Sequence, residues 1–262
     1  MKNPNTQKKM WIGSSWKMNK TSSEVKRFCE AVVPALNDLP ESVQSFLIPP
    51  FPYVEKVAKS LDTQRTKIGV QNVCWAEDGP FTGEVSCSMA KDIGAMLVEI
   101  GHSERRYWFG ETDDTVNKKV RATLDAGMSP LICVGDTADE RHWGVSVESI
   151  VRQTKIALHG VTEDELDKVL VAYEPVWAIG ENGVPASPQE AEDGLSAIKN
   201  ALISKYGESA AEKIVLLYGG SVHQNNAAEL IQQPSIDGLF IGRAAWEPEG
   251  YAEILSLVTP FA

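Results

Sequence analysis

The sequence predicts an α/β fold, a single-domain (β/α)₈ barrel over residues 1–262. Short apolar runs rich in Val, Ile and Leu alternate with longer amphipathic stretches, and eight such runs follow one another. Each run ends in a glycine, a proline or a polar loop, which is typical of a parallel strand buried on both faces. Serial β–α units form either a closed barrel or an open doubly wound sheet. Because no GxGxxG motif follows a strand and no linker interrupts the chain, a single barrel is favoured.

Each element has its own signal in the sequence. The predicted strands are residues 10–15, 45–48, 67–71, 96–100, 128–133, 168–173, 213–218 and 238–241. Amphipathic spacing predicts helices between them, including residues 22–37, 115–126, 145–158, 188–205 and 225–232. The start at 188 is the clearest, because Ser187 precedes a proline and Glu190 follows in the first turn. Barrels carry their chemistry on the loops after the strands, so the candidate residues are sought there.

Composition and charge exclude several classes of function. A net charge of −11 argues against nucleic acid and against an anionic membrane surface as partners. The first ten residues lack the apolar stretch of a signal peptide, and no apolar run has the length of a membrane span. A small anionic substrate stays compatible, because a site needs only local donors. No CxxC pair is present, so reduced thiols in a cytoplasmic protein are expected for Cys29, Cys74, Cys87 and Cys133.

Three side chains at the ends of predicted strands are candidates for chemistry. Lys17 follows the first strand, His102 the fourth and Glu174 the sixth. An apolar loop follows Glu174, and a carboxylate under a closing loop suits a general base, because exclusion of water raises its basicity. Each residue alone also has a plain interpretation, as a solvated lysine, a packing histidine or a loop cap. No two histidines have metal-ligand spacing, so no zinc site is expected.

Glycine-containing loops follow the last two predicted strands. Residues 218–221 read YGGS and residues 241–244 read IGRA. Glycines let backbone N–H groups approach a phosphate, and barrels commonly bind phosphate on these two loops. Glycine pairs also make ordinary turns. Their position at the same barrel end as Lys17, His102 and Glu174 favours a phosphate site.

Together these segments resemble the triose-phosphate isomerase family from Met10 to Leu257. The matching segments are SWKMN (15–19), GVQNV (69–73), FTGEVS (81–86), GHSERR (101–106), AYEPVWAIG (172–180) and YGGSV (218–222). GHSERR and AYEPVWAIG are highly specific. The resemblance implies a TIM barrel and an intramolecular oxidoreductase of the aldose–ketose type. It implies a cis-enediolate intermediate and neither a metal nor an organic cofactor.

The resemblance also implies a role for each candidate residue. Lys17 stabilises negative charge on the phosphate side, His102 is the electrophile, Glu174 is the base and Glu104 supports Lys17. The loop at residues 175–184 is implied to be a mobile lid. Main-chain donors to phosphate are implied at Gly180, Ser221, Gly242 and Arg243. The usual dimer of the family implies a homodimer through Thr82, Glu84 and Arg105.

Departures from the family pattern favour a changed substrate. Ser15 stands where the family has asparagine, the lid reads IGENG in place of IGTGK, Gly242-Arg243 replaces Gly-Gly, and Trp246 replaces a smaller residue. SWKMNKT together with AIGENGVPAS resembles the branch of the family that isomerises erythrulose phosphates in erythritol catabolism. Its reaction, L-erythrulose 1-phosphate to D-erythrulose 4-phosphate, needs room for one extra CH₂OH, which Ser15 would help to supply.

Two alternatives stay open. The departures are also compatible with drift in an ordinary triose-phosphate isomerase, which interconverts dihydroxyacetone phosphate and glyceraldehyde 3-phosphate in glycolysis and gluconeogenesis. A non-catalytic barrel that binds phosphosugars is the remote alternative. Loss of Lys17, His102 or Glu174 would have favoured that alternative, and all three are present.

Overall fold

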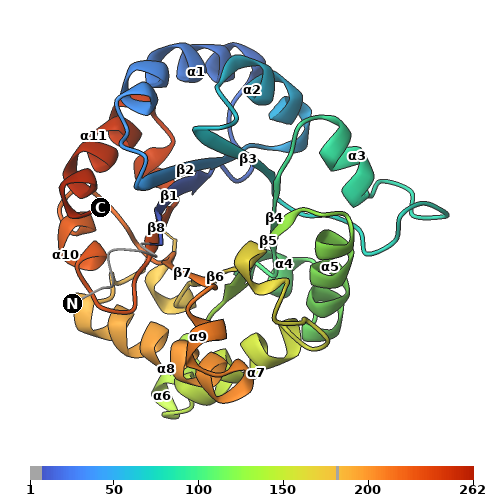
Figure 1. Ribbon diagram of the computed structural model, residues 1–262, viewed down its shortest axis with the longest axis vertical. Helices are drawn as coiled ribbons and strands as arrows, with labels where there is room; N and C mark the ends of the chain where they lie inside the picture. The colour runs from blue at the N-terminus through green and yellow to red at the C-terminus, as the bar shows by residue number, and fades with distance from the viewer. Residues whose placement is uncertain (1–7, 181–182) are drawn as a thin grey trace.

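Eight parallel strands close into a barrel in the computed structural model, which describes residues 8–180 and 183–262 (Figure 1). Spatial order follows sequence order, and the last strand pairs with the first. The strands are β1 Met10–Ser15, β2 Val43–Ile48, β3 Thr66–Val70, β4 Leu97–Ile100, β5 Ser129–Val134, β6 Leu170–Tyr173, β7 Val215–Tyr218 and β8 Gly238–Ile241. The predicted barrel is therefore confirmed. The predicted domain also includes residues 1–7 and 181–182, which lie outside the described residues.

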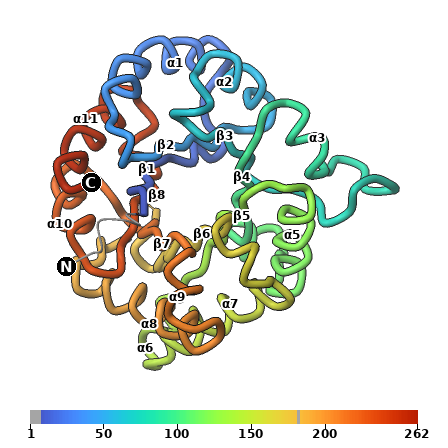
Figure 2. Tube along the Cα trace, in the orientation of Figure 1, coloured from blue at the N-terminus to red at the C-terminus, as the bar shows by residue number. Residues whose placement is uncertain are grey.

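Helices surround the barrel in a ring, as Figures 1 and 2 show. They are α1 Ser22–Asn37, α2 Val54–Ser60, α3 Cys87–Asp92, α4 Ser103–Trp108, α5 Asp113–Asp125, α6 Ala138–His142, α7 Ser146–Ala157, α8 Pro188–Tyr206, α9 Glu208–Ala211, α10 Ala227–Ile231 and α11 Pro248–Val258. The predicted start of α8 is confirmed: the Ser187 hydroxyl accepts from the Glu190 N–H, and the Glu190 carboxylate accepts from the Ser187 N–H. Among the described residues, no helix is both long and apolar enough to cross a membrane.

Side chains fill the interior of the barrel below its mouth. Alternate residues of each strand point inward, and they form a cluster of Phe46, Ile48, Leu97, Leu131, Cys133, Leu170, Ala172, Val215, Leu217 and Phe240. Gly13 is needed in this interior, because a Cβ there would lie 2.3 Å from Cγ of Phe46. Because the barrel interior is filled by side chains, the active site of such a fold is expected at the carboxyl ends of the strands.

One segment projects beyond the ring of helices. It connects β3 to α3 and forms the protrusion beside α3 in Figures 1 and 2. Thr82 and Glu84, both predicted dimer residues, are exposed on this segment. Trp75 packs edge-on against Phe81 at 6.1 Å between ring centroids, so the two aromatic rings stabilise the protrusion from within.

Candidate active site

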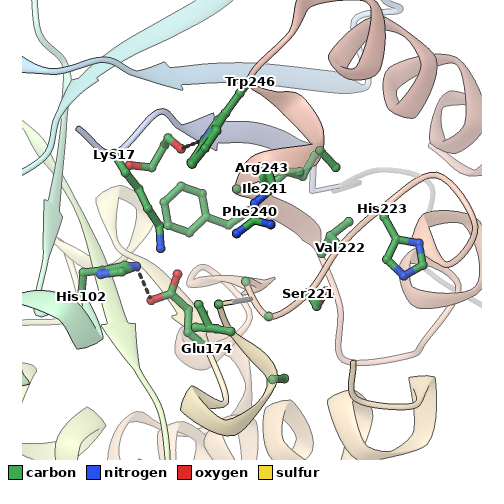
Figure 3. A pocket seen from close by; sticks show the side chains of 18 of the residues that line it. Lys17, His102, Glu174, Ser221, Val222, His223, Phe240, Ile241, Arg243 and Trp246 are labelled. Carbon is green, nitrogen blue, oxygen red and sulfur yellow. Dashed lines mark hydrogen bonds and ion pairs between the residues drawn. The ribbon is translucent and has the colours of Figure 1, made fainter. Parts of the chain in front are cut away.

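A cavity of about 430 Å³ opens at the carboxyl ends of the strands (Figure 3). Its volume suits a small ligand. All nine residues predicted for catalysis or substrate binding line it, namely Ser15, Lys17, Gly180, His102, Glu104, Glu174, Ser221, Gly242 and Arg243. Residues that come from opposite ends of the sequence therefore meet in one place, as the order of the strands around the barrel requires.

Lys17 is held in an unusual backbone conformation directly after β1. Its φ of 52° is in the left-handed region, which residues other than glycine seldom adopt. The Gln71 side chain donates to the Lys17 carbonyl oxygen at 2.8 Å, and Lys17 Nζ donates to Glu104 Oε1 at 2.7 Å. Burial opposes ionisation of Glu104, but the hydrogen bond and charge of Lys17 outweigh it and lower the pKa of Glu104. The ammonium group is thus fixed at the cavity wall.

His102 presents one ring nitrogen to the cavity in a defined protonation state. It caps α4, and its Nδ1 accepts from the Glu104 N–H at 3.1 Å, which leaves the proton of the neutral ring on Nε2. Burial and the charge of Lys17 lower the pKa of His102 to about 4, so the ring is neutral at pH 7. Nε2 lies 3.7 Å from Glu174 Oε2, and Figure 3 shows the two side chains facing each other. The ring can therefore donate a hydrogen bond to a carbonyl oxygen.

Glu174 is a buried carboxylate with an unused acceptor. Its Oε2 has no hydrogen-bond partner among the residues that the structure describes. Burial, followed by the charge of Glu99, raises the pKa of Glu174 to about 8, with Lys17 opposing. Gly219 allows this position, because a Cβ there would lie 2.8 Å from Cγ of Glu174. A desolvated carboxylate beside a neutral imidazole has the basicity that proton abstraction from carbon needs.

Asp136, which the sequence reasoning missed, anchors the first turn of the predicted lid. The hydroxyl of Tyr173 donates to Asp136 Oδ1 at 2.9 Å, and the indole of Trp177 donates to Oδ2 at 3.0 Å. The Val176 N–H also donates to the Asp136 carbonyl oxygen at 2.9 Å. Asp136 lies two residues after β5, and this position in the sequence could have identified it as a candidate. The lid residues at 181–182 lie outside the described residues.

Ser15 belongs to a small polar cluster, here called the Ser15 corner, which consists of Ser15, Glu99 and Trp246. Ser15 Oγ donates to Glu99 Oε2 at 2.8 Å, and the Trp246 indole donates to the Ser15 carbonyl oxygen at 3.1 Å. Glu99 lies on β4 and was also missed by the sequence reasoning. A carboxylate within an apolar strand was its signal. Ser15 and Trp246 both line the cavity, so the space beside serine is bounded by the indole ring.

The loops after β7 and β8 form the opposite side of the cavity from His102 (Figure 3). Ser221 is half-buried, and Arg243 is exposed at the start of a short 3₁₀ helix, η4 Arg243–Ala245. The Arg243 guanidinium has no hydrogen bond or ion pair with any described residue. Gly180 reaches the cavity from the lid with a φ of 93°. The two cations, Lys17 and Arg243, favour an anionic ligand within a chain of net charge −11.

Together the fold and the cavity define a barrel enzyme that moves protons on a small anionic substrate. Comparison with known protein families agrees: the family model described as triosephosphate isomerase matches residues 10–258. The chain belongs to the triosephosphate isomerase family, and it is an isomerase, an intramolecular oxidoreductase.

Several curated relatives share one name over nearly the full length of the chain. The L-erythrulose-1-phosphate isomerase of Mesorhizobium japonicum is 47% identical over 246 residues, which cover 94% of this chain and 95% of that protein. The protein of the same name from Brucella abortus is 46% identical, with 95% and 96% covered. That from Mycolicibacterium smegmatis is 44% identical, with 95% and 92% covered. This chain is thus similar to enzymes from several bacterial genera that are named for a four-carbon substrate.

Proposed function

We propose that this protein interconverts L-erythrulose 1-phosphate and D-erythrulose 4-phosphate without a cofactor. The observation that carries the choice of substrate is the shared name of relatives that are 44–47% identical over nearly the whole chain. The cavity supports the chemistry, because it brings a buried carboxylate, a neutral imidazole and a fixed ammonium group together. The departures at Ser15 and Trp246 lie in the same cavity and support a changed substrate.

The proton transfer needs only side chains that line the cavity. In L-erythrulose 1-phosphate the carbonyl is at C2, and the Glu174 carboxylate takes the proton from C3. The electron pair of that C–H bond forms the C2=C3 double bond, while the carbonyl electrons move to the oxygen on C2, which accepts from His102 Nε2–H. Lys17 stabilises the negative charge of the resulting enediolate. His102 relays a proton from the oxygen on C3 to that on C2, Glu174 returns its proton to C2, and the carbonyl forms at C3.

The phosphate is proposed to lie between Lys17 and the loops after β7 and β8. Main-chain N–H groups of Gly180, Ser221, Gly242 and Arg243 would donate to it, since backbone donors at glycine-containing loops bind phosphate well. The location of these loops around one cavity supports this assignment. For the tetrulose, the proton shift interconverts two ketoses, and the extra CH₂OH is on the carbon that Glu174 deprotonates.

The test is kcat/KM of the purified protein on L-erythrulose 1-phosphate and dihydroxyacetone phosphate, side by side. We expect a preference for the four-carbon substrate, and a Ser15→Asn variant should shift the ratio toward the triose by about 10-fold or more, the range that one substituent commands. A preference for dihydroxyacetone phosphate would identify an ordinary triose-phosphate isomerase. Binding of both sugars without turnover of either would identify a phosphosugar-binding barrel.

The active form is proposed to be a homodimer through Thr82, Glu84 and Arg105. Exposed apolar side chains support an interface: Trp108 and Phe109 are adjacent at the end of α4 and are 79% and 70% exposed, and Met18 is 95% exposed. Exposed apolar groups of this size commonly mark contact surfaces. Sedimentation of the full chain should therefore give twice the mass of 28.7 kDa. A Thr82→Arg variant should reduce that mass to one chain, and a wild-type monomer would contradict the proposal.

A cytoplasmic location is proposed as well. All four cysteines, Cys29, Cys74, Cys87 and Cys133, are buried and unpaired. Burial raises the pKa of Cys29 to about 11, so this thiol stays protonated at neutral pH. Free thiols of this kind suit a reducing compartment.

A further inference from the structure

Glu99 has an environment that stability alone does not explain. It lies on β4, where it points into the barrel from a strand whose residues are all buried, and it is 3% exposed. A buried carboxylate is costly unless it is paired and hydrogen-bonded. Among the described residues the Glu99 side chain has no ion pair, and the hydrogen bond from Ser15 is the only one that this side chain makes. By contrast, buried Glu111 has ion pairs to Arg105 at 2.9 Å and to Lys119 at 2.8 Å.

The bond to Glu99 determines what Ser15 presents to the cavity. A serine hydroxyl has one proton to donate and two lone pairs that accept. The proton of Ser15 is used on Glu99 at 2.8 Å, so only acceptor capacity remains for a ligand. The Trp246 indole fixes the Ser15 backbone from the other side at 3.1 Å. Ser15 is thereby an oriented acceptor in the cavity wall, and such an acceptor matches the hydroxyl of a substrate.

We propose that Glu99 is a positioning residue for substrate choice: it holds the Ser15 hydroxyl as an acceptor for the terminal hydroxyl of a four-carbon ketose phosphate. This inference rests on the proposed function, because a triose phosphate has no such group. When the triose is bound, no hydroxyl of the substrate donates to the lone pairs of Ser15. When the tetrulose is bound, they accept from its extra CH₂OH. Polar recognition of this kind discriminates more strongly than added room alone.

The charge state of Glu99 makes the preference depend on pH. Burial raises the pKa of Glu99 to about 7, with the hydrogen bond from Ser15 and the charge of Lys17 opposing. The other groups that act on it are Glu104 and Arg105 of α4, Cys133 of β5 and Glu174, directly after β6. Above pH 7 the ionised carboxylate can only accept from Ser15. Below pH 7 the protonated carboxyl can itself donate to Ser15, which uses a lone pair and releases the hydroxyl proton.

The experiment compares the ratio of kcat/KM on L-erythrulose 1-phosphate to that on dihydroxyacetone phosphate. At pH 8, Glu99→Leu should lower this ratio about 10–100-fold relative to the parent, the size of one substrate hydrogen bond. Ser15→Ala should lower it similarly, and the double variant should lower it no further than either single one, because both changes remove one interaction. Glu99→Gln keeps an acceptor oxygen and should restore most of the preference.

The pH profile separates positioning from a merely structural role. The ratio should fall below pH 7 in the parent and stay constant in Glu99→Gln, since ionisation of the two substrate phosphates cancels in the ratio. Glu111→Gln is the matched control: it removes another buried carboxylate, and it should lower stability without changing the ratio. If Glu99→Leu does not fold, Ser15→Ala and the two pH profiles still decide.

The outcomes also distinguish this inference from the proposed function. A parent enzyme that prefers dihydroxyacetone phosphate at every pH overturns both. A parent that prefers the tetrulose, with the same preference retained in Glu99→Leu and Ser15→Ala, overturns the role of Glu99 alone. Equal losses on both substrates in Glu99→Leu, together with a ratio independent of pH in the parent, would also overturn it.

Discussion

Two regions of the cavity differ in how their polar groups are satisfied. In the proton-transfer centre of Lys17, His102 and Glu174, the carboxylate of Glu174 has a buried oxygen without a hydrogen-bond partner among the described residues. In the Ser15 corner, the carboxylate of Glu99 accepts from Ser15 at 2.8 Å. Both carboxylates are buried in the barrel mouth, and burial raises the pKa of each, to about 8 for Glu174 and about 7 for Glu99.

The difference separates chemistry from recognition. An unsatisfied carboxylate is reactive, because it is stabilised by gaining a proton. The adjacent imidazole is neutral, so it does not stabilise the ionised carboxylate with a positive charge. A carboxylate that accepts from a serine is occupied, and it directs that serine instead. Changes in the first region should therefore affect turnover of every substrate, whereas changes in the second should affect the choice between substrates.

The largest expected effect is on turnover in Glu174→Gln. The amide cannot take a proton from carbon, so kcat should fall about 1,000-fold or more on both substrates. A loss of this size is expected when a general base is removed. Binding of glycerol 3-phosphate, which has the phosphate but no carbonyl, should change little by calorimetry. The comparison breaks if Ser15→Ala lowers kcat on both substrates as much as Glu174→Gln does.

The next largest expected effect is the pH dependence of kcat/KM. Glu174 acts as a base only when ionised, and its pKa of about 8 in the free enzyme means that the active fraction grows as pH rises. We expect kcat/KM to rise about 10-fold per pH unit from pH 6 toward 8 and to level off above. In Glu99→Gln the neighbouring charge is absent, so the midpoint should move to lower pH. A parent profile already flat above pH 5 would show that Glu174 is not perturbed.

Much of the fold followed from patterns in the sequence. Strands β1 and β8 have their predicted bounds, and the bounds of the other strands differ from the prediction by one or two residues. The predicted helices correspond to α1, α5, α7, α8 and α10. Helices α2, α3 and α6 have only five to seven residues, too few to show a period, and were not predicted. Local capping signals nevertheless mark two of their starts: the Ser86 hydroxyl accepts from the Met89 N–H at α3, and Thr137 and Glu140 form a capping box at α6.

The candidate site was predictable to the extent that its residues follow strands. Lys17, His102 and Glu174 stand at strand ends inside specific motifs, and all three line the cavity. Glu99 lies inside a strand, where alternation alone does not show whether a carboxylate points toward the cavity or pairs elsewhere. Its bond to Ser15 joins residues 84 positions apart, and only the closed barrel brings them together.

The smallest expected effect, and the one that compares the two carboxylates most directly, is on stability. A folded-state pKa raised above the unfolded value of 4.5 contributes stability that is full below pH 4.5 and is lost as pH rises through about 8 for Glu174 and about 7 for Glu99. Above those values each ionised side chain costs burial energy that glutamine does not. Glu174→Gln should therefore stabilise the protein at pH 9 by about 1–2 kcal/mol, a rise in Tm of about 2–6 °C, and should have little effect at pH 4.5.

Glu99→Gln should stabilise the protein less than Glu174→Gln does. The ionised carboxylate of Glu99 accepts a hydrogen bond from Ser15, and the amide of the variant accepts that bond more weakly. Thermal unfolding of both variants at pH 9 decides this, and an equal gain at the two positions would mean that the bond from Ser15 does not distinguish them.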